Sequence, residues 1–401
     1  MAGGWKLPEN SINGTALSAA NVANAHGADA SYYNPAAMAF NEDGASFEAA
    51  LTLIHLSGIE YSNPALSLSD ETKVENIPVP SFHYVGPAMG NFRFGLSMVT
   101  PGGLSKRWKG FGKTSSEEFS LETMEINPTI VFKINDQFSM GGGVRAIYSK
   151  GVVKSDDQGP IFAASGGTLS PARDMEGDSW DFGYNLALHF KATDNLKLSA
   201  TYRSKIGLTE EGTVTLSPSS LGLTPGLPTI NTSASVSIPI PAAFSLAAAF
   251  DISDQTTVEL VLERTYWSAY KDLDFNYPVN VFPYTSVFDD PAVKNWKDTN
   301  TLRIGVTHQM DSRWTVMGGF AYDKTPEPEY YVGFELPDSD AKIFSLGARY
   351  QYSDNLNIGA AFLYDKKDKL EIASSNSTLF TSATFEDAAA YLLTIGVNYT
   401  F

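Results

Sequence analysis

Apolar and polar side chains alternate along most of the chain after residue 45. The final segment shows this most clearly, because every second residue is apolar: Leu393, Ile395, Val397, Tyr399 and Phe401. The ranges 196–202 and 356–364 repeat the pattern. Successive side chains of a β-strand point to opposite faces, so each such segment would present one apolar face. The pattern therefore predicts strands whose apolar faces contact lipid or a core.

Short and long connections alternate between these segments. Six compact turns, most of them rich in Asn and Asp, lie at 86–91, 133–138, 191–196, 251–256, 308–314 and 351–356. Asn and Asp bond to their own backbone and tolerate left-handed geometry, which suits tight reversals. Seven longer stretches lie near 60–78, 100–120, 152–178, 207–235, 268–298, 323–342 and 366–388. Thirteen connections would join fourteen strands, and an even number is typical of a bacterial outer-membrane barrel.

A soluble β-sandwich or a β-helix would also show alternation. Three features favour a membrane barrel: the chain ends inside a strand at Phe401, long and short connections alternate, and the aromatic residues, which include 19 Tyr and 24 Phe, gather at segment ends. We therefore predict an all-β fold, a 14-stranded antiparallel transmembrane β-barrel formed by residues 46–401. Its expected location is the outer membrane of a Gram-negative cell, and a monomer is expected.

Composition excludes several other classes of protein. The net charge of −17 argues against nucleic-acid binding, which requires a basic surface. The longest weakly polar run, 238–250, contains two prolines and is too short for a membrane helix. The five histidines are scattered without metal-ligand spacing, and Gly177–Ser179 lacks the G-x-S-x-G pattern of hydrolases. We expect no metal, no cofactor and no enzymatic activity.

The first 45 residues lack the alternation. The first forty residues are rich in Ala, Asn and Gly, and within the stretch "GADASYYNPAAMAF" (27–40) Pro35 disfavours helix at Asn34. A barrel of this size encloses a lumen that wall side chains alone do not fill. We predict that residues 1–45 form a hatch, a plug inside the lumen. A disordered tail is the alternative.

The start "AGGWKLPE" and the Asn-Pro-Ala at 34–36, within the stretch at 27–40, form a recognisable pair of motifs. They resemble the hatch of the FadL family of outer-membrane long-chain fatty-acid transporters, which carries an Asn-Pro-Ala motif. Further similar segments follow in order: "SLETMEIN" (120–127), "WDFGYNLAL" (180–188), "TYRSKI" (201–206), "TYWSAY" (265–270), "NWKDTNTLRIG" (295–305) and "FAYDKTPEPE" (320–329). The resemblance implies fourteen strands. It also implies that Asn34, Pro35 and Ala36 hold the hatch, which we expect to lie against a kinked third strand.

The resemblance also implies a route for a hydrophobic ligand. In the family it passes from an outer groove to a lumenal pocket, then sideways through a gap made by an inward kink of the third strand. Pro101, Gly102 and Gly103 fall at that kink, although Pro-Gly-Gly also suits an ordinary strand end. The expected groove consists of loop residues Ile161, Phe162, Leu221, Leu223, Leu227 and Ile230. The alternative is that these residues only pack the loops over the barrel mouth.

Basic side chains near the lumen would lower the cost of burying a carboxylate head group. The candidates are Lys150, Lys154, Arg203 and Lys297, for which salt bridges with Asp and Glu are the competing role. We expect passive transport of long-chain fatty acids or similar hydrophobic compounds, in contact with outer-membrane lipid and lipopolysaccharide. A channel for aromatic hydrocarbons of the toluene type is the first alternative, and a general porin is a second, less favoured one.

Overall fold

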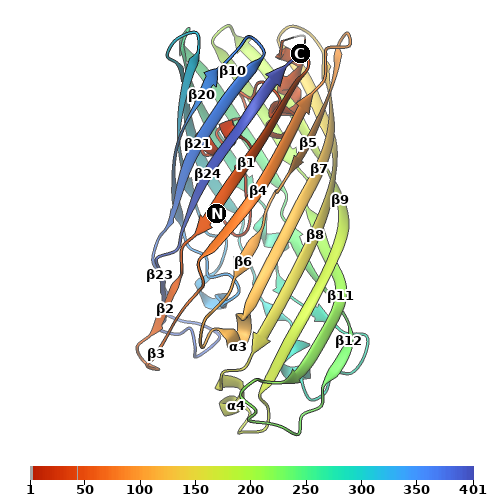
Figure 1. Cartoon of the computed structure of the whole chain (residues 1–401), viewed down its shortest axis with the longest axis vertical. Coiled ribbons are helices and arrows are strands. Elements are labelled where there is room, and N and C mark those ends of the chain that lie inside the picture. Colours follow the sequence, from red (N-terminus) through yellow and green to blue (C-terminus); the bar gives the residue numbers. More distant parts are fainter. Residues whose placement is uncertain (1–2, 43) are drawn as a thin grey trace.

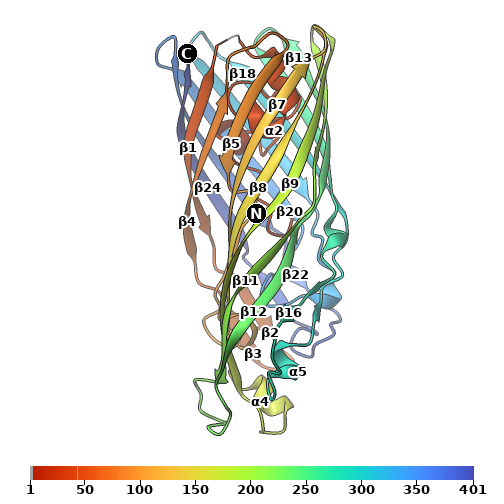
Figure 2. The ribbon, with the colours of Figure 1, turned by 90° about the vertical axis from the view of Figure 1, so that its right-hand side faces the viewer.

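The structure is a computed structural model that describes residues 3–42 and 44–401. It is a closed antiparallel barrel of fourteen strands, seen from two sides in Figures 1 and 2. The first strand, β1 (Ser46–Leu56), pairs with the last, β24 (Ala389–Thr400), so the sheet closes on itself. The predicted fold class is confirmed.

Some wall strands are continuous and others consist of two pieces. The continuous strands are β1, β4 (Glu75–Val85), β7 (Glu118–Lys133), β8 (Phe138–Asp156), β9 (Pro171–Thr193), β18 (Thr299–Gln309), β19 (Trp314–Asp323), β20 (Ala341–Gln351), β21 (Leu356–Lys367) and β24. The divided strands are β5 (Phe92–Val99) with β6 (Leu104–Lys106), β10 (Leu196–Arg203) with β11 (Ile206–Pro218), β12 (Ile230–Ile240) with β13 (Ala243–Ser253), and β14 (Thr256–Thr265) with β16 (Phe275–Asn276). Pairing is interrupted at each division, so the wall departs there from a plain cylinder.

The long loops carry small elements of their own. Two further sheets are β22 (Leu370–Glu371), β23 (Thr384–Glu386), β2 (Glu60–Asn63) and β3 (Leu68–Glu71), and the pair β15 (Asp272–Leu273) and β17 (Ala292–Val293). The loop helices are α3 (Lys113–Ser116), α4 (Pro160–Ala164), α5 (Thr285–Phe288), and the 3-10 helices η2 (Trp267–Ala269) and η3 (Glu329–Tyr331). Among the described residues, no helix has the length and apolar content needed to cross a membrane.

The connections follow the order predicted from the sequence. Short turns join the strands at the end where the chain terminates, and the long loops lie at the opposite end, near α4 (Figure 1). In outer-membrane barrels the short turns face the periplasm and the long loops face outward. The loop end is therefore the extracellular end.

The outer wall carries a band of exposed apolar side chains. Along β9, Phe182, Tyr184 and Leu186 are 68%, 49% and 56% exposed, and the alternate residues Gly183 and Asn185 face inward. Aromatic pairs border the band, among them Tyr148–Trp180 (5.5 Å) toward the loops and Trp314–Tyr350 (4.8 Å) toward the turns. An apolar band between aromatic rims is the lipid-contact surface of a transmembrane barrel.

The hatch, residues 3–42, lies inside the barrel in the half with the short turns (Figure 2, red). It contains α1 (Ile12–Ala16), α2 (Ala30–Tyr33) and the 3-10 helix η1 (Pro35–Phe40). A wall carboxylate holds its backbone, because Glu259 accepts the N–H groups of Val22 (2.7 Å) and Ala23 (2.6 Å). The lumen of this half is therefore filled by a segment tethered to the wall.

Candidate transport path

The third strand of the barrel turns inward between β5 and β6. β4 pairs with β5 only through its residues 82–85. Between the two pieces, the Pro101 carbonyl accepts the N–H of Leu7 (3.0 Å), and the Gly103 N–H donates to the Trp5 carbonyl (2.9 Å). The start of the hatch therefore holds the kink, and most of β4 has no partner strand on this side.

A cavity of about 690 Å³ lies beside this kink, and we call it the wall gap. The unpaired part of β4 lines one side of it, β7 and β8 line the other, and Gly102 and Gly103 also contribute. Leu121 belongs to the inner face of β7 and Glu122 to the outer face, yet both line the cavity. The wall gap therefore reaches from the lumen side of the wall to its outer surface.

Two prolines lie on the open edge of β4. Pro78 and Pro80 both line the wall gap. An unpaired backbone N–H is costly next to hydrocarbon, and proline has none. Proline within a sheet is also confined to edges, where it prevents another strand from adding. The "IPVP" sequence at 77–80 thus allows this edge of β4 to stay without a partner strand at a low cost in free energy.

Buried apolar side chains form one continuous cluster from the long loops to the wall gap. This cluster, the apolar corridor, includes Trp5, Leu104, Phe119, Leu121, Ile147, Met175, Leu208, Leu216, Val236, Ile238, Phe275 and Phe288. At one end, Leu104 and Leu121 line the wall gap as well. At the other end, Ile161, Leu227 and Ile230 are half-buried and pack against it from the loops. The corridor therefore connects the outer loops with the opening in the wall.

Four aromatic rings surround the hatch end of the apolar corridor. The ring centroid of Trp5 lies 4.7 Å from that of Trp267 and 5.1 Å from those of Tyr270 and Trp296. The cavity beside them is only about 10 Å³, so the corridor is closed here by its own side chains. A ligand would have to displace some of these rings in order to pass.

A buried ion pair faces the same small cavity. The Lys294 ammonium donates to the Glu335 carboxylate, and Glu327 lies nearby. Burial lowers the pKa of Lys294, and the charge of Glu327 opposes that shift. Lys297, proposed from the sequence as a lumenal base, is instead exposed. Lys294 is buried because it shares its side of the segment with Trp296, two residues on.

Lys150 and Lys154 also lie elsewhere than expected. They occupy alternate positions of β8 with Tyr148, which faces outward, whereas Ser149 and Ser155 face the lumen. Lys150 pairs with Glu176 (2.7 Å) and Lys154 with Asp174 (3.0 Å), both on the outer face of β9. The side chains of these two lysines therefore do not lie in the lumen, because strand side chains alternate between faces. Lys150 nevertheless lines the wall gap from the outer face of β8, so its contact with a ligand carboxylate stays a prediction.

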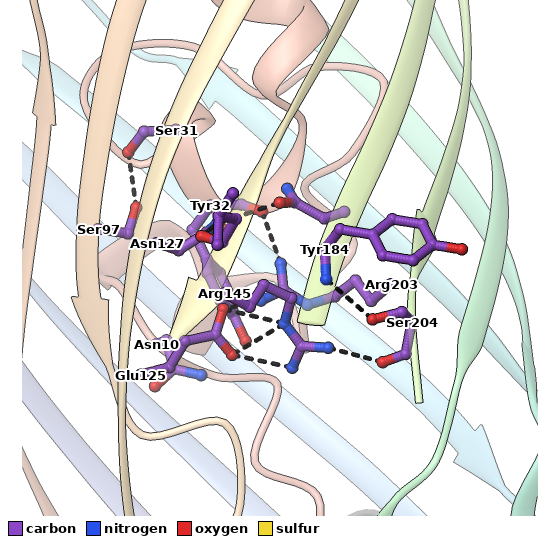
Figure 3. A network of polar contacts seen from close by, with 12 residues as sticks. Asn10, Ser31, Tyr32, Ser97, Glu125, Asn127, Arg145, Tyr184, Arg203 and Ser204 are labelled. Atoms are coloured by element: carbon purple, nitrogen blue, oxygen red, sulfur yellow. Dashed lines mark hydrogen bonds and ion pairs between the residues drawn. The ribbon is translucent and has the colours of Figure 1, made fainter. Parts of the chain in front are cut away.

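Arg203 does reach the lumen, where it belongs to a buried polar network (Figure 3). Its guanidinium donates to the Glu125 carboxylate and lies 4.3 Å from the ring of Tyr32 in the hatch. Arg145 donates to the same carboxylate at 2.9 Å and to the Ser204 carbonyl, also at 2.9 Å. Arg203 is therefore bonded to a protein carboxylate, which it shares with Arg145, rather than free to bind a ligand.

One carboxyl group faces the apolar corridor without a cation beside it. Glu210 lies on β11, beyond the lipid-facing band, and is 1% exposed. Burial raises the pKa of Glu210 to about 7. Near neutral pH this group therefore carries only part of a negative charge.

Within 3–42 and 44–401, no three His, Asp or Glu side chains are grouped so as to hold a metal ion.

Comparison with known families identifies the architecture. The profile of the family described as "Outer membrane protein transport protein (OMPP1/FadL/TodX)" matches residues 1–401. The chain belongs to this family. It is therefore an outer-membrane transport protein rather than an enzyme, and the resemblance noted in the sequence is confirmed.

Individual relatives are distant but cover most of the chain. The long-chain fatty acid transport protein of Salmonella typhi is 22% identical over 377 residues, which are 86% of this chain and 84% of that protein. A FadL homologue from Pseudomonas aeruginosa has a similar crystal structure, with a TM-score of 0.84, 22% identity, and 99% and 100% of the two chains covered. The crystal structure of the Ralstonia pickettii toluene transporter TbuX is similar with a TM-score of 0.73 and 18% identity, and the match covers 98% of this chain and 99% of that one. These structures share the fold of this FadL-family chain.

The Asn-Pro-Ala motif of the FadL family lies at the start of η1 in the hatch. The fully buried Asn34 amide donates to the Val22 carbonyl (2.8 Å) and to the Ser199 hydroxyl on β10 (2.9 Å). The Ala36 carbonyl accepts from Ser139 on β8 (2.7 Å). The motif's own hydrogen bonds therefore go to β8 and β10. The kink itself is contacted by the segment from Trp5 to Asn10. Hatch residues close to the motif bond to β5 of the kinked strand, because the Ser31 hydroxyl lies 2.8 Å from the Ser97 hydroxyl and the Met38 carbonyl accepts from Arg93 (3.0 Å). That the motif holds the hatch against this strand stays a prediction.

Replacing Asn34 with alanine is expected to loosen the hatch while leaving the barrel assembled. The change leaves the Val22 carbonyl and the Ser199 hydroxyl without this partner, which costs about 1–3 kcal/mol for buried groups. Hydrogen exchange followed by mass spectrometry should show faster exchange in residues 12–40 and unchanged exchange in the wall. The matched control is Asn41→Ala, which loses one part-buried bond to Gly27. Equal exchange in both variants would contradict the anchoring role of Asn34.

The residues expected to form the outer groove come from loops that do meet. The Ser170 and Ser219 hydroxyls lie 2.7 Å apart, which joins the loop of α4 to the loop after β11. Ile161, Leu227 and Ile230 pack against the corridor, and Phe162 is half-buried. Leu221 and Leu223 point away, with 46% and 42% of their surface exposed. The half-buried members thus form a patch at the mouth of the corridor.

Proposed function

We propose that this FadL-family protein carries long-chain fatty acids, or similar hydrophobic compounds, passively across the outer membrane. The ligand binds between the long loops, enters the apolar corridor and leaves sideways through the wall gap. The observation that carries the proposal is the continuity of the corridor: Ile161 packs on its outer end, and Leu121 belongs both to it and to the wall gap. Each CH₂ group removed from water on this route contributes about 0.8 kcal/mol.

The polarity of the lumen supports the sideways exit. Below the corridor, toward the periplasm, lie the hatch and the charged groups of Glu125, Arg145 and Arg203. An apolar chain gains nothing by moving into hydrogen-bonded charges, whereas the wall gap leads toward membrane hydrocarbon. Release into the bilayer is therefore the downhill step for such a ligand.

Two classes of ligand compete for this assignment. Relatives from Salmonella typhi and Escherichia coli are named long-chain fatty acid transport proteins, which supports fatty acids. The aromatic side chains around Trp5 and the fold shared with a toluene transporter support an aromatic hydrocarbon as the second candidate. The length of the corridor, from loops to wall gap, favours the extended ligand.

Uptake by cells that lack their own fatty-acid transporter tests the proposal. Expression of the protein should raise uptake of radiolabelled oleate, and unlabelled oleate should compete more strongly than toluene. The reverse order of competition would favour the hydrocarbon channel. If the protein instead admitted small hydrophilic solutes in liposome swelling and failed to raise oleate uptake, the proposed function would be wrong.

A further inference from the structure

Arg173 of β9 is a buried cation that lacks a carboxylate partner. It is 9% exposed, and its guanidinium lies 4.1 Å from the ring centroid of Phe275 and 4.8 Å from that of Phe288. Its Nε has no hydrogen-bond acceptor. Among the residues the structure describes, no Asp or Glu oxygen comes within the 4.0 Å of an ion pair with it. The Tyr277 hydroxyl is the polar side-chain group that interacts with its guanidinium.

Four other arginines on the lumen side of the wall have carboxylate partners. Arg145 and Arg203 share Glu125, Arg349 pairs with Glu48 (2.6 Å), and Arg303 lies 3.6 Å from Glu263. Taking a guanidinium out of water without an anion is unfavourable, and the two phenylalanine rings offset only part of that cost. Burial accordingly lowers the pKa of Arg173, although an arginine stays charged. The site therefore lacks one negative charge.

The position of Arg173 connects it with the mouth of the corridor. In the sheet it lies directly opposite Leu216 of β11, which in turn lies opposite Ile230 of β12. The three residues form one inward-facing row across neighbouring strands. Phe275, Phe288 and Leu216 are members of the apolar corridor, and Ile230 packs against it. A cation and the apolar surface for a long chain therefore lie side by side at the extracellular end.

We propose that Arg173 is the receptor for the carboxylate of an incoming fatty acid, with the alkyl chain lying in the apolar corridor. This inference rests on the proposed function and adds the group that selects the ligand class. A guanidinium presents a planar fork that binds both oxygens of a carboxylate, and this geometry is specific to arginine. A neutral hydrocarbon or alcohol would use the same apolar surface without the ion pair.

Binding to the purified barrel in a non-ionic detergent tests the assignment. The probes are oleate and oleyl alcohol, which share a chain and differ in the head group. Arg173→Met keeps most of the length and removes the charge, so oleate affinity should fall about tenfold or more and oleyl alcohol affinity should change little. Arg173→Lys keeps the charge but lacks the planar fork of donors, so its affinity for oleate should lie between those of the wild type and Arg173→Met. The control is Arg264→Met, an exposed arginine paired with Asp298 on the same end of the barrel.

The outcomes separate this inference from the proposed function. If the wild-type barrel binds neither probe, the proposed function itself is wrong. If it binds both, and Arg173→Met weakens both equally or neither, the role of Arg173 in recognising the carboxylate is excluded while hydrophobic transport stands. Retention of the folded, heat-shifted band of the barrel in electrophoresis shows that each variant has assembled.

Discussion

Replacing Gly103 with phenylalanine is expected to reduce oleate uptake by about tenfold or more, because a bulky ring narrows the opening beside the kink, where the chain of the ligand would pass. Gly103 lines the wall gap, and a Cβ at this position would lie 3.2 Å from the Leu121 carbonyl oxygen. The added ring would therefore lie in the wall gap after a small adjustment of β7. Oleate binding to the purified protein should be retained, since the loops and the corridor are unchanged. Loss of uptake with retained binding is the signature of a blocked exit.

Gly102 is the less suitable position for this experiment. A Cβ there would lie 2.6 Å from the Trp5 carbonyl oxygen, so any side chain would displace the start of the hatch as well. The matched control for Gly103 is Gly318→Phe on β19, where a Cβ meets nothing closer than the Ser345 carbonyl oxygen at 3.7 Å. It adds the same ring to the outer face of a wall away from the gap. Uptake by Gly103→Phe equal to that of the control would rule out the sideways route.

The strands and turns of the fold were predictable because their signals are local. Alternation has a period of two residues, and the tight turns carry Asn or Asp wherever the backbone reverses. The kink of the third strand was also predictable, because Pro101 removes a donor and the two following glycines weaken pairing. The divisions of other strands were not expected. The break between Arg203 and Ile206, for example, falls in a stretch without proline or an unusual turn sequence.

The charged residues show where a linear reading fails. Glu125 and Arg203 are 78 positions apart, and only the closed wall brings them together. The faces of Lys150 and Lys154 were set by a local rule, however, since they share their side of β8 with the aromatic Tyr148. The same rule would have predicted that Lys294, rather than Lys297, is the buried lysine, because Lys294 lies two residues before Trp296 and shares its side of the segment. The resemblance to a family gave the positions of these basic residues only approximately. A shift of one residue along a strand moves a side chain from the lumenal face of the wall to the outer face.

The distribution of paired and unpaired charges has a functional meaning under the proposed route. Cations below the corridor already have carboxylate partners, as in the Glu125 network, where one carboxylate bonds to two guanidinium groups, and these bonds would hold the hatch and the wall together. The cation at the mouth, Arg173, has no carboxylate partner among the described residues. A single carboxylate entering from outside would therefore meet a cation without a carboxylate partner first and cations bonded to carboxylates later. This order favours capture at the mouth and release toward lipid.

Replacing Glu125 with glutamine is expected to destabilise the barrel by about 3–5 kcal/mol, because two guanidinium groups would remain buried without a negative charge. Glu125 is fully buried and receives donors from both Arg145 and Arg203. The measurement is the free energy of unfolding by urea after refolding into lipid vesicles. The matched control is Asp368→Asn, which breaks the exposed pair with Lys342 (2.7 Å, with both side chains about half exposed) and should cost about 1 kcal/mol or less.

A second variant distinguishes lost charge balance from lost packing. If the cost arises from the unpaired cations, adding Arg145→Met and Arg203→Met to Glu125→Gln should recover much of the stability, because no buried charge then remains in the network. If the cost arises from altered packing, the triple variant should be less stable than the single one. A Glu125→Gln protein no less stable than the Asp368→Asn control would show that water reaches this network. In that case the polar layer would no longer bar an apolar chain from the hatch, and the sideways exit would need another cause.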